Sequence, residues 1–355
     1  MKDKVVDSNA PPDRVRSLLA HTSKLFAARP FTPHPIFKTG HAQTLGAFAW
    51  PRKYRFQTPL DEEQIFDVTT DVKVLGRCRW QQDRREHPTM IIWHGIEGSS
   101  ESTYMIAMAD KAFKAGFNVI RMNLRTCGGT EHLTNTIYHG GLTEDLREVV
   151  RQLIDDHHLE RLFLVGFSLG GNMVLKLAGE YADNAPKEIV AICAVSPSVD
   201  LTASADLILK SSNWIYNRDF VYRLKKRLRD KHKRFPELYD ITGLELVRTL
   251  REFDNQFTAK AHGFADAEDY YYKASSIRVA DKIRIPTLII HAQDDPFIPF
   301  EPLLNPVFTN NPYILLIDTE RGGHVAFVSG KANGEDRFWS ENRVVEFCKL
   351  AQESL

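Results

Sequence analysis

The sequence contains few cysteines and no long apolar run. Its four cysteines, in 355 residues, lie far apart and include no Cys-x-x-Cys pair, so neither a disulfide framework nor a cysteine-bound zinc is predicted. No stretch approaches the roughly 18 consecutive apolar residues of a membrane-spanning helix, and the first residues lack the apolar core of a signal peptide. We therefore expect a reduced, cytoplasmic protein.

An excess of charge of either sign is also missing. Lys and Arg total 46, as do Asp and Glu, so no global field attracts nucleic acid, and no nucleic-acid partner is expected. The sequence has no phosphate loop, dinucleotide G-x-G-x-x-G turn or His-x-x-x-His pair, so no cofactor and no metal are expected. With 43% hydrophobic and 26% charged residues, the composition is that of a globular enzyme.

From residue 65 onward, strand patterns alternate with helical patterns. Four apolar runs bounded by turn residues predict strands buried on both faces: 90–93, 117–122, 162–165 and 189–195. Two more strands are predicted at 287–291 and 313–317. Helical patterns lie at 103–115, 142–157, 169–182 and 336–350. Two alternating segments, 65–70 and 72–80, predict an antiparallel pair at a sheet edge. This order predicts an α/β fold, with a mostly parallel sheet covered by helices on both faces.

An N-terminal extension, residues 1–60, precedes this main domain, residues 61–355. Its apolar positions follow helical spacing and are Val15, Leu18, Leu19, Thr22 and Phe26. Such a stripe predicts a helix that docks on the main domain. A helix lying on a membrane surface is the alternative.

Residues 200–278 interrupt the alternation between the sixth and seventh predicted strands. They are rich in aromatic and charged residues, hold several helical stretches and contain no convincing strand. Ligands bind at the carboxyl edge of open α/β sheets, and an insertion at this point is placed to cover that edge. We predict a helical lid, with a plain helical decoration as the alternative.

A Gly-Phe-Ser-Leu-Gly motif at 166–170 joins a predicted strand to a predicted helix. A strand that turns this sharply leaves no room for Cβ atoms beside the serine, which explains Gly166 and Gly170. The turn raises the serine hydroxyl at the sheet edge, and the helix N-terminus favours developing negative charge. We therefore predict an α/β-hydrolase fold with Ser168 as its nucleophile. A glycine-rich turn with a passive serine is the alternative.

A serine nucleophile needs a base, and the base needs a partner that fixes its tautomer. His324 follows the last predicted strand and Asp295 follows the strand before it. The chain order Ser, acid, His is that of the α/β-hydrolase fold. Because both residues lie on loops at the carboxyl ends of strands, we predict a triad of Ser168, Asp295 and His324. Asp294 and Asp200 are the alternative acids.

The oxyanion of an acyl-transfer intermediate needs backbone N–H donors aimed at it. The N–H of Leu169, directly after the serine, is the first predicted donor. The second is the N–H of Ile96, in the His-Gly-Ile-Glu-Gly segment at 94–98, where two glycines let the loop approach the substrate oxygen. An ordinary glycine turn is the alternative.

The predicted lid carries aromatic and basic residues. Trp214, Tyr216 and Phe220 are candidates for lining an acyl pocket, because such pockets are mostly apolar. The segment 223–235 holds eight Lys or Arg and one Asp. Its first interpretation is a solvated helix face, and weak contact with anionic lipid head groups is the second. Outside the lid, Cys127 lies in a glycine-rich turn without a base signature, which favours a structural role.

Several segments together resemble a known family, the YheT-like hydrolases (AB hydrolase 4 family). They are Thr-Gly-His-Ala-Gln-Thr at 39–44, Ile-Ile-Trp-His-Gly-Ile-Glu-Gly-Ser at 91–99, Asn-Leu-Arg-Thr-Cys-Gly-Gly at 123–129, Gly-Phe-Ser-Leu-Gly-Gly-Asn at 166–172 and Asp-Asp-Pro-Phe at 294–297. Thr39 stands where the family often has asparagine, and Thr126 where it usually has glycine. Neither departure touches the predicted triad.

The resemblance implies carboxylesterase or acylglycerol-lipase-like activity on a small-molecule or lipid ester. It implies an acyl-enzyme on Ser168, with Asp295 and His324 completing the triad. It does not distinguish short-chain from acylglycerol-type esters, and it leaves the oligomeric state open. The alternatives are the same machinery acting on thioesters or amides, and a ligand-binding protein that has lost turnover.

Overall fold

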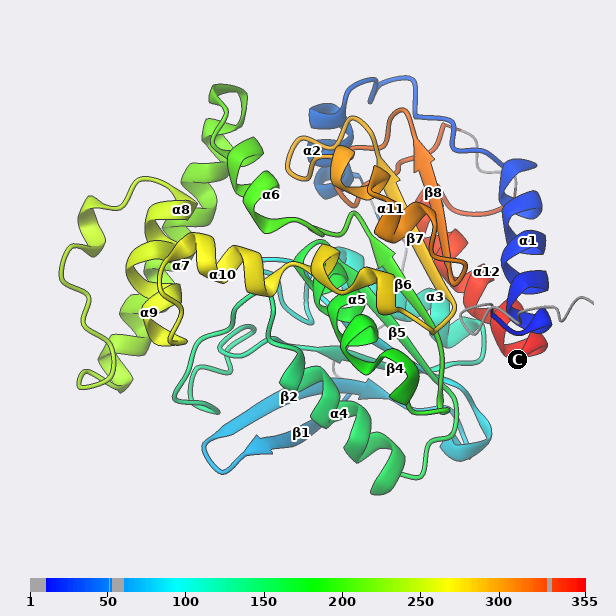
Figure 1. The fold of residues 1–355 in the computed structure, drawn as a ribbon, viewed down its shortest axis with the longest axis horizontal. Coiled ribbons are helices and arrows are strands. Elements are labelled where there is room, and N and C mark those ends of the chain that lie inside the picture. Colours follow the sequence, from blue (N-terminus) through cyan, green and yellow to red (C-terminus); the bar gives the residue numbers. More distant parts are fainter. Residues whose placement is uncertain (1–10, 51, 53–60, 331–333) are drawn as a thin grey trace, which may run out of the picture.

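The computed structural model of the chain describes residues 11–50, 52, 61–330 and 334–355. An eight-stranded sheet forms its centre, in the order β1-β2-β4-β3-β5-β6-β7-β8 (Figure 1). The strands are β1 (Glu62–Thr69), β2 (Val72–Arg79), β3 (Thr89–Trp93), β4 (Asn118–Met122), β5 (Leu162–Phe167), β6 (Ile189–Val195), β7 (Thr287–Ala292) and β8 (Ile314–Thr319). The pairs β1/β2 and β2/β4 are antiparallel, and the other neighbours are parallel. The predicted mostly parallel sheet is confirmed.

Burial explains the sequences of the central strands. Every residue of β3, β5 and β7 is buried, because helices cover both faces of the sheet, and apolar residues predominate in all three. In the edge strand β1 only Phe66 is buried. β6 has the predicted bounds, and the other parallel strands differ from prediction by at most two residues at either end.

Four helices at the predicted positions cover the sheet. α3 (Thr103–Lys114) and α12 (Trp339–Ser354) contact each other on one face. On the opposite face, α4 (Thr143–Asp155) packs against α5 (Leu169–Tyr181) (Figure 1). The layers are therefore helix, sheet and helix, as expected for an α/β fold.

The N-terminal helix α1 (Asp13–Ala27) packs against α12 and β8. Its buried residues are those of the apolar stripe: Val15, Leu18, Leu19, Thr22 and Phe26. The stripe therefore faces the protein and is not available to a membrane surface.

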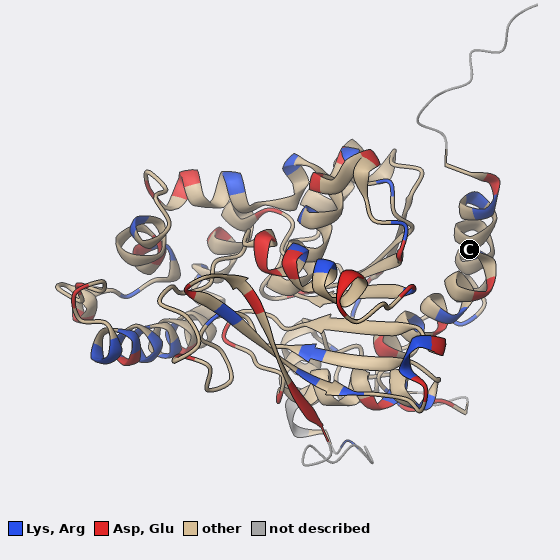
Figure 2. Cartoon of the chain, turned by 90° about the horizontal axis from the view of Figure 1, so that it is seen from below, with Lys and Arg blue, Asp and Glu red and all other residues tan. Residues whose placement is uncertain are grey.

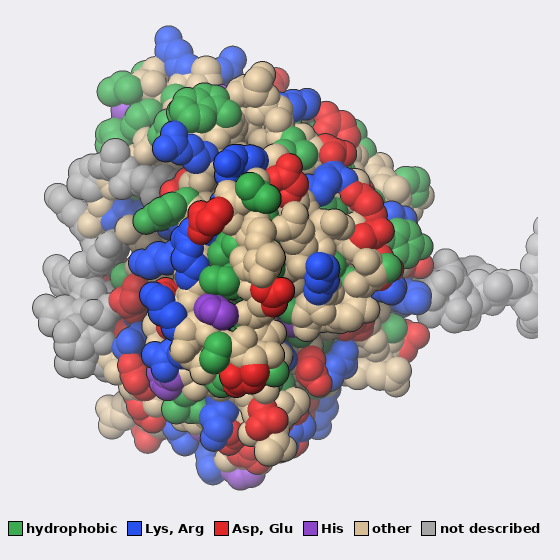
Figure 3. Space-filling view, turned by 90° about the vertical axis from the view of Figure 1, so that its left-hand side faces the viewer, with side chains coloured by type: hydrophobic (Ala, Val, Ile, Leu, Met, Phe, Trp, Pro, Cys, Tyr) green, Lys and Arg blue, Asp and Glu red, His purple; other side chains and the backbone are tan. Residues whose placement is uncertain are grey.

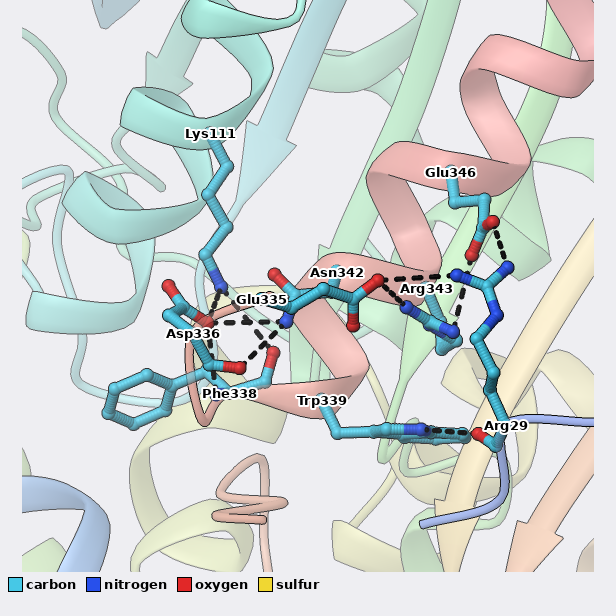
Figure 4. Close-up of polar contacts among 9 residues, drawn as sticks. All are labelled: Arg29, Lys111, Glu335, Asp336, Phe338, Trp339, Asn342, Arg343 and Glu346. Carbon is cyan, nitrogen blue, oxygen red and sulfur yellow. Dashed lines mark hydrogen bonds and ion pairs between the residues drawn. The ribbon is translucent and has the colours of Figure 1, made fainter. Parts of the chain in front are cut away.

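Polar contacts also tie the segment after α1 to α12 (Figure 4). The indole Nε1 of Trp339 donates to the carbonyl oxygen of Arg29 at 3.0 Å. The Arg29 guanidinium pairs with Glu346 and, at 3.3 Å, with Glu335. These links hold the described part of the extension on the helix layer formed by α3 and α12.

A second helix of the extension, α2 (Gly40–Ala49), is not predicted by the sequence pattern, because its two glycines lower helix propensity. Thr39 caps its N-terminus. A Cβ on Gly40 would lie 1.8 Å from the backbone oxygen of Asp294. Glycine is therefore needed where α2 meets the loop after β7.

Residues 200–278, here called the insertion, contain helices and no strand. The helices are α6 (Leu201–Ile208), α7 (Trp214–Arg234), α8 (Leu250–Phe253), α9 (Ala259–Ala261) and α10 (Ala267–Ala274). They form the yellow-green lobe beside the sheet (Figure 1). Val221, Leu224 and Leu228 of α7 belong to a hydrophobic cluster separate from that of the sheet. A π-helical turn, Asp254–Thr258, joins α8 to α9.

The basic run 223–235 lies in and just after α7 (Figure 2), and its interpretation as a solvated helix face is wrong for three of its cations. The Lys231 ammonium is buried and donates to carbonyl groups of the 131–134 loop. Lys225 is buried as well, and Arg227 is 13% exposed. Burial lowers the pKa of Lys231 to about 8. The contacts of these three cations connect the insertion to other segments of the chain, or connect two segments within the insertion.

The outer face of the insertion mixes both signs of charge with scattered apolar side chains (Figure 3). Two of its exposed cations have acidic neighbours: Arg223 pairs with Asp219 at 2.8 Å, and Lys233 with Asp230 at 3.2 Å. Across the described residues, no helix combines the length and apolarity needed to cross a membrane.

Candidate active site

Ser168 occupies the sharp turn between β5 and α5. Its φ is 54°, in the left-handed region, and its N–H donates to the carbonyl oxygen of Val195 at 2.9 Å. A Cβ on Gly166 would lie 2.2 Å from the Gly170 carbonyl oxygen, and one on Gly170 would lie 2.6 Å from that of His94. Close backbone approach therefore requires both glycines, as a nucleophile elbow does.

Asp295 and His324 meet although 29 residues separate them in the chain. His324 Nδ1 lies 2.8 Å from Asp295 Oδ2. Asp295 Oδ1 accepts hydrogen bonds from the N–H groups of Phe297 and Ile298, at 2.8 and 3.0 Å. Burial raises the pKa of Asp295, but the charge and hydrogen bond of His324, with the other donors, hold that pKa below its usual value. The ionised carboxylate accepts the Nδ1 proton, which leaves His324 Nε2 as a free acceptor.

The two alternative acids have other partners. Asp294 Oδ1 accepts the N–H of Gly323 at 2.9 Å, so Asp294 braces the turn that carries His324. Asp200 caps α6 and accepts the N–H of Ala203 at 3.1 Å. In the described part of the chain, neither carboxyl group bonds the imidazole.

Two backbone N–H groups beside Ser168 lack acceptors. Among the hydrogen bonds of the described residues, none has the N–H of Ile96 or Leu169 as its donor. The N–H of Gly95, by contrast, donates to the hydroxyl of Tyr104 at 3.0 Å. A Cβ on Gly95 would lie 2.9 Å from the Cβ of Ser168, so the 94–98 loop passes directly against the serine.

His94, which was not predicted as a site residue, shapes this loop. Its Nε2 accepts the N–H of Leu124 at 3.1 Å, so its Nδ1 donates to the carbonyl oxygen of Gly95 at 2.7 Å. Burial lowers the pKa of His94 to about 4, which keeps the ring neutral at pH 7. One of the segments that resemble the YheT-like family, 91–99, contains this residue. No spacing rule, however, identifies a single histidine as a residue that holds a loop in place.

Another of the five resembling segments, 39–44, braces the His324 loop from the N-terminal side. The hydroxyl of Thr44 accepts the backbone N–H of His324 at 2.9 Å. The Gln43 amide accepts the N–H of Val328 at 2.8 Å and donates to its carbonyl oxygen at 3.2 Å. Sequence reasoning missed these roles, because 280 residues separate Thr44 from His324.

Two cavities have Ser168 and Ile96 in their linings. The first, of about 780 Å³ including the part open to solvent, also includes Leu169 and extends into the insertion. Apolar side chains of the insertion line much of it: Leu201, Ile208, Leu224, Leu228, Leu250 and Phe253. The second, of about 620 Å³ on the same measure, includes His324.

The three aromatic candidates of the predicted lid lie in different places. Phe220 lines the second cavity. The Tyr216 ring lies 4.4 Å from that of Phe297, and its hydroxyl is 3.1 Å from His41 Nδ1 of α2. Trp214 is 59% exposed, and neither Trp214 nor Tyr216 lines either cavity, so the expectation that these two residues line the pocket is wrong.

Residues 88–331 match the family profile described as the alpha/beta hydrolase fold. The chain belongs to this family. YheT of Escherichia coli is 32% identical over 319 residues, which cover 89% of this chain and 92% of YheT, so this hydrolase is a YheT-like member, as the resemblance predicted. The monoacylglycerol lipase of Saccharomyces cerevisiae is 31% identical, over 76% of this chain and 60% of the lipase.

Solved structures share the fold of this hydrolase. The esterase Pf2001 of Pyrococcus furiosus superposes with a TM-score of 0.56 at 19% identity, over 84% of this chain and 96% of that one. Est1E of Butyrivibrio proteoclasticus gives a TM-score of 0.53 at 16% identity, over 82% and 99%. At such identities the likeness shows the fold alone, and the predicted α/β-hydrolase fold is confirmed.

An ion pair joins the insertion of this hydrolase to the loop beside the serine. Arg227 donates to both carboxylate oxygens of Glu97, at 2.9 and 3.0 Å, and also to the carbonyl of Thr126. The two paired side chains are 13% and 3% exposed. Glu97 directly follows Ile96 and has a φ of 53°. The position of the Ile96 N–H therefore depends on a residue of α7.

The remaining candidate nucleophile, Cys127, is buried, and burial raises the pKa of its thiol to about 12. A thiol with such a pKa stays protonated and inert near neutral pH, which fits the predicted structural role. Among the described residues, no group of three or more His, Cys, Asp or Glu side chains is arranged to hold a metal ion.

Proposed function

We propose that this hydrolase cleaves carboxylic esters, of short-chain or acylglycerol type, through an acyl-enzyme on Ser168. His324 Nε2 takes the hydroxyl proton as Ser168 Oγ attacks the carbonyl carbon, and the N–H groups of Leu169 and Ile96 hold the oxyanion. Asp295 orients the imidazole and stabilises its protonated form. The departing alcohol takes the proton from His324, and a water deprotonated by the same base then releases the acid.

The observation that carries the proposal is the bond from Asp295 to His324, which lines the second cavity together with Ser168. It orients Nε2 as a proton acceptor at the sheet edge where the elbow presents the serine hydroxyl. No hydrogen bond joins Ser168 to His324 in this structure, and in free enzymes such contacts are often long and tighten when substrate binds. The name of the yeast relative, monoacylglycerol lipase, supports an ester with an apolar acyl chain.

The linings of the two cavities indicate where each half of the substrate binds. The general acid must lie beside the leaving oxygen, so the alcohol occupies the second cavity, whose lining includes His324. The acyl group then occupies the first cavity, whose lining includes both proposed oxyanion donors. The apolar side chains of the insertion in that cavity fit an alkyl chain.

The insertion acts as a lid in this proposal. Its helices supply one wall of the acyl cavity, and Arg227 ties it to the loop that carries Ile96. The lid therefore shapes both the acyl site and one oxyanion donor.

Two measurements test the proposed function. A fluorophosphonate probe should label the wild-type protein at Ser168 and leave Ser168→Ala unlabelled, with both proteins folded by circular dichroism. A series of p-nitrophenyl esters from acetate to palmitate, with a monoacylglycerol and a matched thioester and amide, then defines the substrate class. Absence of labelling and of turnover on the whole series would favour the ligand-binding alternative.

A further inference from the structure

One carboxyl group faces the acyl cavity among mostly apolar side chains. Asp254, at the start of the π-helical turn between α8 and α9, lines the same cavity as Ser168 and is the single acidic residue among the described lining residues. It is 7% exposed. Burying a carboxylate is unfavourable unless it is paired or fully hydrogen-bonded, so its partners determine what it can still bind.

Hydrogen bonds occupy only part of the acceptor capacity of this carboxylate. Thr258 Oγ1 donates to Oδ1 at 2.7 Å, and the Tyr271 hydroxyl donates to Oδ2 at 2.8 Å. A carboxylate has about four acceptor positions, so about two remain. The pKa of Asp254 is raised to about 6 by burial, although these hydrogen bonds act to lower it. Near neutral pH the group is therefore mostly ionised, with spare capacity to accept hydrogen bonds.

No described cation neutralises Asp254 through an ion pair. The nearest arginine in sequence, Arg251, directs its guanidinium to Asp206 at 2.5 Å and to Glu268. A wholly apolar acyl chain in this cavity would displace water from Asp254 without replacing its hydrogen bonds, which is unfavourable. A chain with a donor at that position would replace them.

We propose that the acyl group bound in this cavity carries a hydrogen-bond donor, a hydroxyl or an ammonium group, that binds Asp254. The inference rests on the proposed function, because that function places the acyl group in this cavity. Asp254 is then a specificity residue that distinguishes substituted acyl chains from plain ones. π-Helical turns frequently occur at functional sites, and here the turn presents Asp254 to the cavity while Thr258 bonds it from within the same turn.

A purely structural role for Asp254 predicts something different. In that case its bond with Tyr271 simply joins the π-helical turn to α10. Removal of the carboxylate would then lower stability without changing the preference between two esters. The decisive readout is therefore a ratio of kcat/KM values, measured beside a melting temperature.

The test compares pairs of p-nitrophenyl esters that differ by a terminal hydroxyl or a terminal ammonium group, for acyl chains from butanoate to dodecanoate. Wild-type protein should favour the substituted ester by about tenfold or more at one chain length, since sites built to hydrogen-bond a substrate group reject analogues that lack it. Asp254→Leu should abolish or reverse that ratio. Asp254→Asn, which keeps the shape, should lose the ammonium preference and retain part of the hydroxyl preference.

Thr258→Val is the matched control, because it removes one bond to Asp254 but leaves the carboxylate. It should melt at a lower temperature and keep the substrate ratio. A ratio near one at every length in wild type, or an unchanged ratio in a folded Asp254→Leu protein, would overturn the proposal. If Asp254→Leu does not fold, the ratio for Asp254→Asn decides. Failure of the proposed function is distinguishable, because Ser168 would then not react with fluorophosphonate and no ester would turn over.

Discussion

The sheet region and the insertion bury their polar groups in different ways. In the sheet region, the buried Asp295 lies on a loop directly after a strand and bonds N–H groups two and three residues further on. In the insertion, Lys231 and Arg227 reach partners 100 and 130 residues away in the chain. A local turn therefore preorganises Asp295, whereas long-range contacts of buried cations determine how the insertion sits on the sheet region.

We therefore expect mutations in the two regions to have different effects on activity and stability. A change to Asp295 should affect the chemical step while leaving the fold intact, because the N–H groups that hold its carboxylate lie in the same loop. A change at Arg227 should affect folding and activity together, because its removal leaves Glu97 buried without its cation. The following experiments test this contrast, from the largest expected effect to the smallest.

The largest effect is expected at the sheet edge, from Asp295→Asn. The neutral amide neither stabilises protonated His324 nor holds the productive tautomer, so kcat on a soluble p-nitrophenyl ester should fall by about 10⁴-fold. The melting temperature should change little. Asp294→Asn is the neighbouring control: its amide oxygen still accepts the N–H of Gly323, and kcat should fall by less than about tenfold. A larger loss for Asp294→Asn than for Asp295→Asn would contradict the assignment of Asp295 as the partner of the histidine.

The next effect is expected at the contact between the two regions, from Arg227→Met. Glu97 is then buried without its cation, and the free energy of unfolding should fall by about 3 kcal/mol. The Ile96 N–H should also lose its position, with kcat lower by about 10- to 100-fold, which is less than the full loss of one oxyanion donor because the N–H is displaced and not removed. Urea denaturation and steady-state kinetics measure the two effects.

Two variants serve as controls for Arg227→Met. Arg227→Met with Glu97→Gln removes the uncompensated charge and should recover part of the lost stability. Arg229→Met breaks a pair with Glu245 whose side chains are 36% and 74% exposed, and it should change stability by less than about 1 kcal/mol. Similar losses for Arg227→Met and Arg229→Met would contradict the contrast between buried and exposed cations of α7.

A third effect concerns the pH dependence of stability at His94. Burial lowers its pKa to about 4 from an ordinary 6.5, so between these values the unfolded chain binds a proton that the folded chain does not. Stability contributed by neutral His94 is therefore lost as pH falls through this window, by about 3 kcal/mol at pH 4. Urea denaturation at pH 7 and pH 4 should show that His94→Gln loses less stability on acidification than wild type.

Asp254 changes the stability in the opposite direction over nearly the same pH range. Its pKa is raised in the folded state, so in this range the folded chain binds a proton that the unfolded chain does not. The two contributions partly cancel in wild type, so the difference between variant and wild type is the informative quantity. His21→Gln, at an exposed position, should follow the wild-type curve. A His94→Gln curve parallel to wild type would show that His94 is not held neutral in the folded protein.

The smallest effect is expected at the exposed cations of α7. Replacing Arg223, Lys226, Lys233 and Arg234 together by serine should leave ester turnover unchanged, and binding to anionic vesicles should stay near background in both proteins. Acidic neighbours already pair with Arg223 and Lys233, and exposed pairs of this kind contribute little. Vesicle binding by wild type that is lost in the variant and falls with salt would instead support contact with anionic lipid.

The sequence by itself determined the local elements of this protein. β6 has the predicted bounds, and α3, α4, α5 and α12 lie at the predicted positions, because a strand buried on both faces and a helix buried on one leave distinct apolar patterns. The glycines at 166 and 170 also showed where a strand must turn sharply into a helix. Asp295 and His324 were predicted to meet from fold knowledge and chain order, and their catalytic roles stay predictions.

Only the tertiary structure decided which distant groups meet. Nothing in the run 223–235 distinguishes the buried Lys231 from the exposed Lys233, since both have the same side chain and differ only in the helix face they occupy against other segments. The brace from Thr44 to the His324 loop and the pair of Arg227 with Glu97 join residues 280 and 130 positions apart. Local sequence patterns encode burial within one element, but the partner of a buried charge depends on how separate elements pack.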